Sequence, residues 1–361
     1  MAEQTLGAGI IGCGGIGNCH ATALTLIPGV RIVGVADIDE SRAAAYAKRY
    51  HADAYYTDVA SLLARKDLDF VIVTTANDQH APLTIQALEA GRHVMVQKPM
   101  ALNLAEAEAM VQAAKASGKK LMVSFFELFH PAFVKAKEIV DRGLIGDVFF
   151  FKAIMAWYMP STDVWRFDPK ISGGGILMDG HSHHVAYFRW LTGEEAQTVY
   201  TEAGTLASNA RVEDTGVTLI RTRKAIAEVS GSMRLIEPNQ QNGRYFKEWL
   251  EIYGTKGTIH IRPTERPSIR VYAEGAGIPE GLNGWFSPKV QWVPFEERGR
   301  ALHFNPDEDP WTAEHKHFVE CIRNDKPVVT DGEFGAKVLE VVQAGYRSMA
   351  EGRRISLPLD R

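Results

Sequence analysis

The segment GGGILMDGHSHH, residues 173–184, places an acid and three histidines directly after three glycines. Three kinds of structure fit these residue types. They can bind a metal ion, they can supply a catalytic acid–base pair, or they can start a helix whose histidines pack in the core. The spacing of the side chains, and the elements around them, decide between these alternatives.

Asp179 and His183 have the spacing of an acid–base pair. If a helix starts near Asp179, the two side chains lie four residues apart on one face. The carboxylate can then hold one imidazole nitrogen and leave the other to take a proton. Such a pair can act as a general base.

His181 and His184 fall on a different face of the same helix. Their spacing allows metal binding, but a catalytic zinc site needs a third protein ligand and an open position. Glu127 is a conceivable third ligand, and no pattern in the sequence places it nearby. We therefore expect no metal, with His181 pointing toward a substrate and His184 packing against a sheet.

A glycine motif near the N-terminus indicates a dinucleotide site. Residues 12–17 read G-C-G-G-I-G, after an apolar run and before a helical pattern. In that context the glycines allow a tight turn and let the backbone approach a pyrophosphate at the helix N-terminus. Asp37 ends the next strand, where a carboxylate binds ribose hydroxyls and favours NAD over NADP. The alternatives are a turn without a ligand, and helix capping by Asp37 or Asp39.

The end of the third predicted strand carries further polar residues. Thr75, Asn77 and His80 follow the run DFVIVT. Ligands of open α/β sheets bind outside the carboxyl ends of the strands. Asn77 and His80 therefore either contact nicotinamide and its ribose or cap the following helix.

These candidate residues lie in two regions with different patterns. Residues 1–125 alternate short apolar strands with helices, which predicts a Rossmann domain with a doubly wound parallel sheet. Residues 126–361 predict an α/β domain with a large, mostly antiparallel open sheet. Its predicted strands are 147–157, 198–205, 214–222, 225–234, 247–254, 258–263, 268–274 and 290–295, and its helices include 131–141 and 333–352.

Composition excludes several classes of protein. The chain has 361 residues, and its net charge of -4 argues against a nucleic-acid binder. We find neither a signal peptide nor an apolar run long enough to span a bilayer. Three cysteines are too few for a disulfide framework. We expect a cytoplasmic enzyme without nucleic-acid or membrane partners.

Several segments together resemble one known family. They are the strand–GCGGIG–helix unit, Asp37, TANDQHAPLTIQALEAGRHVMVQKP, WRFDPKISGGGILMDGHSH and GYRSMAEGRRISL. They are similar to the glucose–fructose oxidoreductase / inositol dehydrogenase / rhizopine-catabolism (Gfo/Idh/MocA) family of nicotinamide-dependent oxidoreductases. The resemblance implies a Rossmann domain followed by an open-sheet domain, and oxidation of secondary alcohols of sugars and cyclitols, or the reverse.

The resemblance also assigns roles. The family's motif residues fall on Lys98, Asp179 and His183, and the Lys98–Pro99 peptide is expected to be cis. Lys98 would donate to the reacting oxygen, while sequence leaves open whether Lys98 or His183 is the base. The chain departs from the family pattern in four places, and these changes bear on the substrate more than on the redox chemistry. They are Gln97 for glutamate, His181 for glycine, Ala186 for aspartate, and Glu127-Leu128 where an arginine is common.

The expected function is NAD-dependent hydride transfer at a secondary hydroxyl of a sugar, a glycoside (at C3) or a cyclitol. An NAD-dependent glycosidase and a non-catalytic NAD-sensing regulator are the alternatives. An open sheet also needs a cover, so we expect a homo-oligomer, as a dimer, tetramer or larger assembly. The predicted cofactor residues are Gly12, Gly14, Gly15, Ile16, Gly17, Asp37, Thr75, Asn77, His80, Gln97 and Lys98. The predicted substrate residues are Lys98, Glu127, Trp165, Arg166, Asp179, His181 and His183.

Overall fold

A computed structural model describes residues 5–159, 162, 164–235, 246–263, 268–274, 284–286 and 309–360. The chain divides into two units, Met1–Phe129 with Gln291–Ala336, and His130–Val290 with Lys337–Arg361. No helix in the described ranges is long and apolar enough to cross a membrane.

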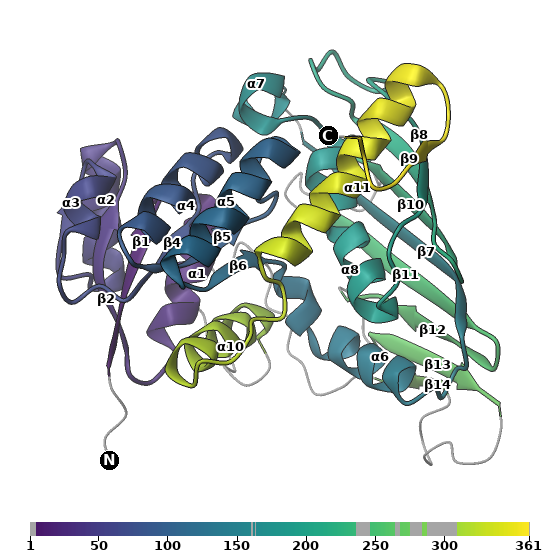
Figure 1. Cartoon of the computed structure of the whole chain (residues 1–361), viewed down its shortest axis with the longest axis horizontal. Helices are drawn as coiled ribbons and strands as arrows, with labels where there is room; N and C mark the ends of the chain where they lie inside the picture. The colour runs from purple at the N-terminus through teal and green to yellow at the C-terminus, as the bar shows by residue number, and fades with distance from the viewer. Residues whose placement is uncertain are drawn as a thin grey trace. The chain divides into compact units, whose positions relative to one another are not determined.

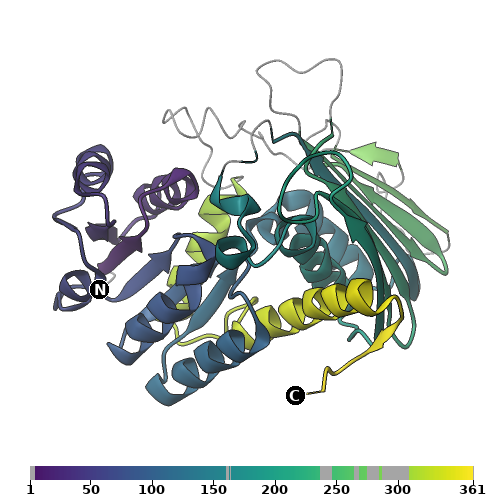
Figure 2. The same cartoon turned by 90° about the horizontal axis from the view of Figure 1, so that it is seen from above.

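The first unit is built on a six-stranded parallel sheet of order β3-β2-β1-β4-β5-β6. This is the doubly wound order, with a crevice where it reverses between β1 and β4. Helix α4 contacts α5, while α1 contacts α2 and α10, and Figure 2 shows helices on both sides of the sheet. The strands are β1 (Leu6–Ile11), β2 (Val30–Ala36), β3 (Tyr55–Tyr56), β4 (Phe70–Val73), β5 (His93–Gln97) and β6 (Leu121–Ser124). The helices are α1 (Gly15–Thr25), α2 (Glu40–Tyr50), α3 (Val59–Leu63), α4 (His80–Glu89), α5 (Leu104–Ser117) and α10 (Pro310–Arg323), with 3₁₀ turns η1 (Asn77–Gln79) and η2 (Phe126–Phe129).

Helix α10 comes from the far end of the chain to complete this unit (Figure 1). Its Phe318 and Val319 belong to the same buried cluster as Phe70 and Met95 of the sheet. Phe318 meets Phe70 edge-on, with ring centroids 5.7 Å apart. The predicted division at residue 125 did not include this return, because nothing in the local pattern of α10 says which sheet its apolar face covers.

Helix α10 also carries a buried acid into the first unit. Glu314 is fully buried and accepts a hydrogen bond from Ser124 Oγ at 2.8 Å. Burial, together with the nearby charge of Glu127, raises the pKa of Glu314 to about 8. Glu314 is therefore protonated at neutral pH, which avoids a buried charge.

The second unit is built on a nine-stranded sheet of order β14-β13-β12-β11-β7-β10-β9-β8-β15. Its pairs are antiparallel except β10 with β7, so the predicted α/β architecture is confirmed in both units. The strands are β7 (Val148–Trp157), β8 (Thr198–Gly204), β9 (Thr215–Arg221), β10 (Ile226–Ser232), β11 (Phe246–Gly254), β12 (Gly257–Ile261), β13 (Ile269–Ala273), β14 (Gly284–Phe286) and β15 (Ile355–Ser356). The predicted strand at 290–295 lies outside the described residues.

Helices cover one face of this sheet in the part of the chain that the structure describes (Figure 1). The opposite face keeps Val217, Leu219 and Ile226 exposed, alternating with buried residues such as Thr218. This alternation is typical of a sheet with a core on one side. The helical segments are α6 (Pro131–Asp141), η3 (Trp165–Phe167), α7 (Pro169–Ser172), η4 (Leu177–His181), α8 (Ser182–Thr192) and α11 (Gly332–Glu351), the last of which begins within the first unit.

The burial of Glu314 predicts a specific pH dependence of stability. Its folded pKa of about 8 lies above the ordinary 4.5, so between these values the folded protein binds the extra proton. Stability therefore falls as pH rises through this window, by about 1 kcal/mol per pH unit from this group. Glu314→Gln, which keeps an acceptor for Ser124, should flatten the decline between pH 6.5 and 8.5. Urea unfolding at both pH values measures it, and equal slopes for the variant and the wild type would contradict the assignment.

Candidate functional site

The glycines of residues 12–17 occupy three different environments. Gly12 has φ +99°, and a Cβ there would lie 2.9 Å from the Thr74 backbone. A Cβ on Gly17 would lie 2.7 Å from Gly12 O. Gly14 and Gly15, in contrast, have open space where a Cβ would project. The close contacts at Gly12 and Gly17 shape the turn, and the open positions at Gly14 and Gly15 leave room for a pyrophosphate at the N-terminus of α1.

Asp37 is fixed against this glycine turn. Its Oδ2 accepts a hydrogen bond from Cys13 N at 2.8 Å, and its Oδ1 accepts one from Asp39 N at 3.0 Å. The N-cap of α2 is Asp39, whose carboxylate accepts from Arg42 N at 3.1 Å. The capping alternative for Asp37 is therefore wrong. The carboxylate is positioned at the end of β2, where ribose hydroxyls bind in dinucleotide folds.

The polar residues after β4 have diverse roles. Thr74 Oγ1 donates to Gly12 O at 2.6 Å and ties the end of β4 to the glycine turn. Buried His80 lies 2.7 Å from Pro99 O through Nδ1 and 3.2 Å from Thr75 O through Nε2. Both nitrogens thus face backbone carbonyls, so His80 joins two loops and does not cap α4. Asn77 starts the 3₁₀ turn η1, and Thr75 lies just before it.

The segment Gln97-Lys98-Pro99 begins at the last residue of β5, and its Lys98–Pro99 peptide is cis as expected. Gln97 is buried, and its Oε1 accepts from Lys98 N at 2.8 Å. Its Nε2 lies 3.1 Å from Nε2 of His20 on α1. Sequence reasoning did not find His20, although it lies only three residues after Gly17. The backbone around Lys98 is therefore held by side chains of its own unit.

In the second unit, the candidate catalytic segment is a π-helical turn followed by α8. The π-helix η4 carries Asp179, and α8 begins at Ser182 and carries His183. Single π-turns occur frequently at functional sites. Arg166 Nε lies 3.9 Å from Asp179 Oδ2, and the Arg166 guanidinium stacks 4.5 Å from the centre of the Trp165 ring. The structure thus brings together the predicted residues Trp165, Arg166 and Asp179.

His183 is buried and has a neighbour that sequence reasoning missed. The Tyr187 hydroxyl lies 3.3 Å from His183 Nδ1, one turn further along α8. In the sequence, Tyr187 has the position of an ordinary core residue of the helix. Its ring is indeed wholly buried, and nothing in its type indicated this contact. The hydroxyl contacts Nδ1 and helps to orient the imidazole.

His181 and His184 are both buried against the sheet, which does not favour contact with a substrate. His181 is 1% exposed, and its Nδ1 lies 3.1 Å from Thr218 Oγ1 of β9, which itself bonds Thr201. The expectation that His181 projects toward the substrate is wrong, because this side chain fills the interface between η4 and the sheet. Burial lowers its pKa to about 4. His184 is also buried, 3.5 Å from Glu248 of β11, as its expected packing against the sheet requires. Across the described residues, no three His, Cys, Asp or Glu side chains gather to hold a metal ion.

The glycine run before η4 is locked by Glu213. Its Oε1 accepts from Gly175 N at 2.9 Å, Leu177 N at 3.1 Å and Tyr346 OH at 2.7 Å. A Cβ on Gly174 would lie 1.8 Å from Tyr346 OH, and one on Gly175 would lie 1.8 Å from Glu213 O. Glycine is therefore required here for close approach. Sequence reasoning missed Glu213 and Tyr346, the latter because it fits the apolar stripe of α11.

Two family models match the two units in order. The model described as "Oxidoreductase family, NAD-binding Rossmann fold" matches residues 6–125, and "GFO/IDH/MocA C-terminal domain" matches residues 133–260. The chain belongs to the Gfo/Idh/MocA family. It is thus an NAD-dependent oxidoreductase, and the open glycine turn with its anchored Asp37 fits that cofactor. The resemblance seen in the sequence is confirmed.

Relatives within the Gfo/Idh/MocA family match over nearly full length. Myo-inositol 2-dehydrogenase of Thermotoga maritima is 26% identical, covering 97% of this chain and 98% of that one. The structure of GenD2 from gentamicin A biosynthesis with NAD is 27% identical, with a TM-score of 0.82 and coverage of 99% and 98%. Levoglucosan dehydrogenase with NADH and levoglucosan is 25% identical, with a TM-score of 0.84 and coverage of 99% and 100%.

Glu127, the remaining predicted substrate residue, lies in the first unit on η2. It is 5% exposed and close enough to Glu314 to raise that residue's pKa. An arginine is common at this point in the Gfo/Idh/MocA family. Here the carboxyl group of Glu127 lies near the protonated carboxyl group of Glu314 instead. The burial of Glu127 does not favour the role of a substrate ligand.

Two cavities are described in the second unit. One, of about 600 Å³, is lined by Trp165 and by polar residues that include Asp168, Asn209 and Arg211. Asp168 and Arg211 form an ion pair of 2.9 Å at this cavity. Because Trp165 also stacks on Arg166, the cavity adjoins the side chains that reach Asp179.

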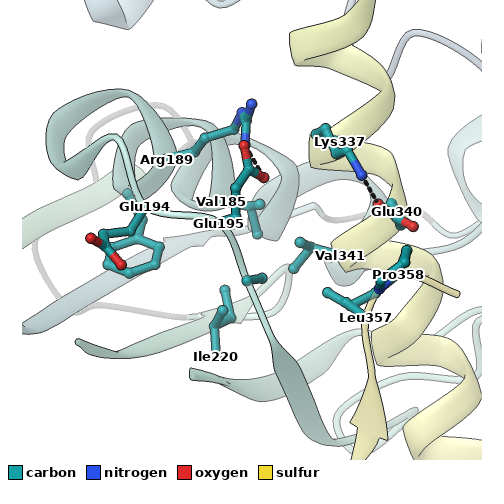
Figure 3. A pocket seen from close by; sticks show the side chains of 12 residues that line it. Val185, Arg189, Glu194, Glu195, Ile220, Lys337, Glu340, Val341, Leu357 and Pro358 are labelled. Carbon is teal, nitrogen blue, oxygen red and sulfur yellow. Dashed lines mark hydrogen bonds and ion pairs between the residues drawn. The ribbon is translucent and has the colours of Figure 1, made fainter. Parts of the chain in front are cut away.

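The other cavity, of about 330 Å³, lies between α8, α11 and the chain end (Figure 3). Arg189 pairs there with Glu195, and Lys337 pairs with Glu340 at 2.8 Å. None of the candidate catalytic residues lines this cavity. Because these two ion pairs occupy most of its charged lining, it does not resemble a site for redox chemistry.

The two glycine environments predict different results from the same substitution. Gly14→Ala should leave the thermal unfolding midpoint nearly unchanged and weaken NAD binding at least about tenfold, because the added methyl lies where the pyrophosphate approaches. Gly17→Ala should weaken NAD binding and also lower stability by about 1–3 kcal/mol, because its methyl clashes with Gly12 O. Calorimetric titration with NAD and thermal unfolding measure the two effects. Wild-type NAD affinity in Gly14→Ala would contradict the cofactor site.

The donors on Glu213 predict a cost for losing one of them. Tyr346→Phe removes the hydroxyl donor to a buried carboxylate and should lower the free energy of unfolding by about 1–3 kcal/mol. Tyr200→Phe is a matched control, because Tyr200 donates to Glu202 on the exposed side of β8. Urea unfolding compares the two variants. Equal stability of both would show that the contact with Glu213 does not hold the segment.

Proposed function

We propose that this enzyme transfers hydride between NAD and a secondary hydroxyl of a sugar, glycoside or cyclitol. The observation that carries the proposal is the segment in which Asp179 meets Arg166 and His183 meets Tyr187. It offers a carboxylate, a guanidinium and an oriented imidazole, which suits a neutral polyhydroxy substrate better than an apolar one. The names of the relatives, which act on inositol and levoglucosan, support the same class.

The chemistry divides between cofactor and protein. NAD accepts hydride from the carbinol carbon when it is bound. Asp179 and Arg166 bind and orient hydroxyl groups, and His183 Nε2 takes the proton of the reacting hydroxyl, with Tyr187 holding Nδ1. Lys98 is the second candidate for proton transfer. Its charge favours alkoxide character at the reacting oxygen as hydride leaves.

We further propose a glycoside, oxidised at C3, as the preferred substrate. The cavity beside Trp165 supports this, because about 600 Å³ with an aromatic wall and an ion pair leaves room for a group beyond the oxidised ring. The exposed sheet face with Val217, Leu219 and Ile226 supports the further proposal of a homo-oligomer.

A screen with NAD against myo-inositol, glucose and methyl and aryl β-glucosides tests the substrate class. Release of aglycone without accumulated NADH would instead indicate the glycosidase reaction, and NAD binding without any turnover would indicate a regulator.

The roles of His183 and its neighbour predict graded effects on turnover. His183→Ala should lower kcat by about 10²–10⁴ with NAD affinity nearly unchanged, the range for a positioned acid–base group. Tyr187→Phe should lower kcat by about tenfold, because the imidazole stays but loses its orienting hydroxyl. Tyr272→Phe, on the exposed face of the sheet, is the control. Steady-state kinetics and NAD titration measure these effects, and wild-type kcat in His183→Ala would remove the imidazole from the mechanism.

A further inference from the structure

A continuous chain of hydrogen bonds crosses the first unit and ends at the backbone of Lys98. His315 Nδ1 lies 2.6 Å from Trp311 O on the same helix, and His315 Nε2 lies 2.9 Å from His20 Nδ1. His20 Nε2 lies 3.1 Å from Gln97 Nε2, and Gln97 Oε1 lies 2.8 Å from Lys98 N. The side chains come from α10, α1 and β5, which are far apart in the sequence.

The two ends of this chain determine every proton in it. A carbonyl oxygen only accepts, so His315 must carry its proton on Nδ1. A neutral His315 then accepts at Nε2, which requires the proton of His20 to lie on Nδ1 as well. His20 accepts at Nε2, and Gln97 must donate to it. At the other end, Lys98 N–H only donates, so Gln97 must present its oxygen there, which fixes the orientation of the amide.

Burial makes this neutral arrangement stable. His20 is 0% exposed, His315 is 1% exposed and Gln97 is 6% exposed. Burial lowers the pKa of His20 well below its usual value and that of His315 to about 4, so neither ring is charged at neutral pH. Trp311, which packs edge-on against His20 at 5.0 Å, closes the cluster on one side.

A second contact holds the same segment from the next residue. His80 Nδ1 lies 2.7 Å from Pro99 O. Lys98 N and Pro99 O, which flank the cis Lys98–Pro99 peptide, therefore each contact a buried side chain of this unit. These contacts fix the backbone from which the Lys98 side chain extends.

We propose that His20 and His315 are positioning residues for Lys98, and that Gln97 is the amide which this histidine chain requires. A carboxylate at position 97, common in the family, offers acceptors only and cannot donate to the bare Nε2 of His20. An amide satisfies His20 and Lys98 N–H together without a charge. The proposal rests on the proposed role of Lys98, and its structural part is independent of that role.

The positions of the protons are the direct test. In the full-length enzyme labelled with ¹⁵N-histidine, His20 and His315 should each show a protonated Nδ1 and a bare Nε2 from pH 6 to 8. His20→Gln and His315→Gln identify the two signals among the 12 histidines of the chain. Gln97→Glu should put a proton on Nε2 of His20, because the carboxylate needs a donor there. Protonated Nε2 atoms in the wild type, or no change in Gln97→Glu, would overturn the proposal.

A matched pair of variants tests the effect on Lys98. His315→Gln retains one acceptor and one donor, whereas His315→Leu retains neither. We expect amide hydrogen exchange at Lys98 to be at least about tenfold faster in His315→Leu and near the wild type in His315→Gln. His93→Leu is the control, because His93 lies on β5 like Gln97 but accepts from Lys120 N, outside this chain of hydrogen bonds. Equal exchange at Lys98 in both His315 variants would overturn the proposal even if one of them is less stable.

Kinetics separate this proposal from the proposed function. On the sugar that gives the highest turnover in the screen, His315→Leu should lower kcat about tenfold or more while the KM for NAD changes less than twofold. His315→Gln should restore kcat to within about threefold. If Lys98→Met retains wild-type kcat, the role of Lys98 fails while the proton positions still stand. If the exchange and ¹⁵N results fail, the positioning chain is wrong, whatever the enzyme oxidises.

Discussion

Backbone N–H groups just beyond the end of a strand, or at the start of a helix, need hydrogen-bond acceptors. This requirement determines how the turns that carry the candidate residues are held. Beyond the end of a strand, the hydrogen bonds of the sheet stop, and a buried backbone N–H without an acceptor is costly. In the first unit, Asp37 accepts from Cys13 N and Gln97 accepts from Lys98 N. In the second, Glu213 accepts from Gly175 N and Leu177 N. The turns that carry chemistry are thus held by side chains rather than by regular secondary structure.

The same need for hydrogen-bond partners explains the buried histidines. A neutral imidazole has one donor and one acceptor, so it can join a group that only accepts to a group that only donates. His20 and His315 do this in the first unit, and His80 faces two carbonyls. Charging any of them would place an ion in a dry interior, which is why burial lowers their pKa values. Their abundance therefore reflects polar packing beneath the site, and it is no sign of a metal.

Local patterns were sufficient to predict most of the fold. The alternation of strands and helices predicted the Rossmann unit, and the helix at 131–141 was placed to the residue. Partners distant in sequence could not be predicted in this way. His315 lies 295 residues from His20, and Tyr346 lies 133 residues from Glu213. His20, His315 and Tyr346 lie on helices and Glu213 lies in a loop, and no local pattern marked the polar contacts that they make.

The contrast between the two units bears on how specificity can vary in this family. The cofactor turn closes over a short stretch, because Cys13 and Asp37 are only 24 residues apart. The glycine run before η4 instead depends on a distant side chain, Glu213, which accepts from Gly175 N and Leu177 N. His181, which departs from the family's glycine, turned out to bond Thr218 beneath the site. His181 therefore supports the packing of η4, which carries Asp179, on the sheet. If Asp179 binds the substrate as proposed, side chains that support η4 alter which hydroxyl is bound without any change in Asp179 or His183.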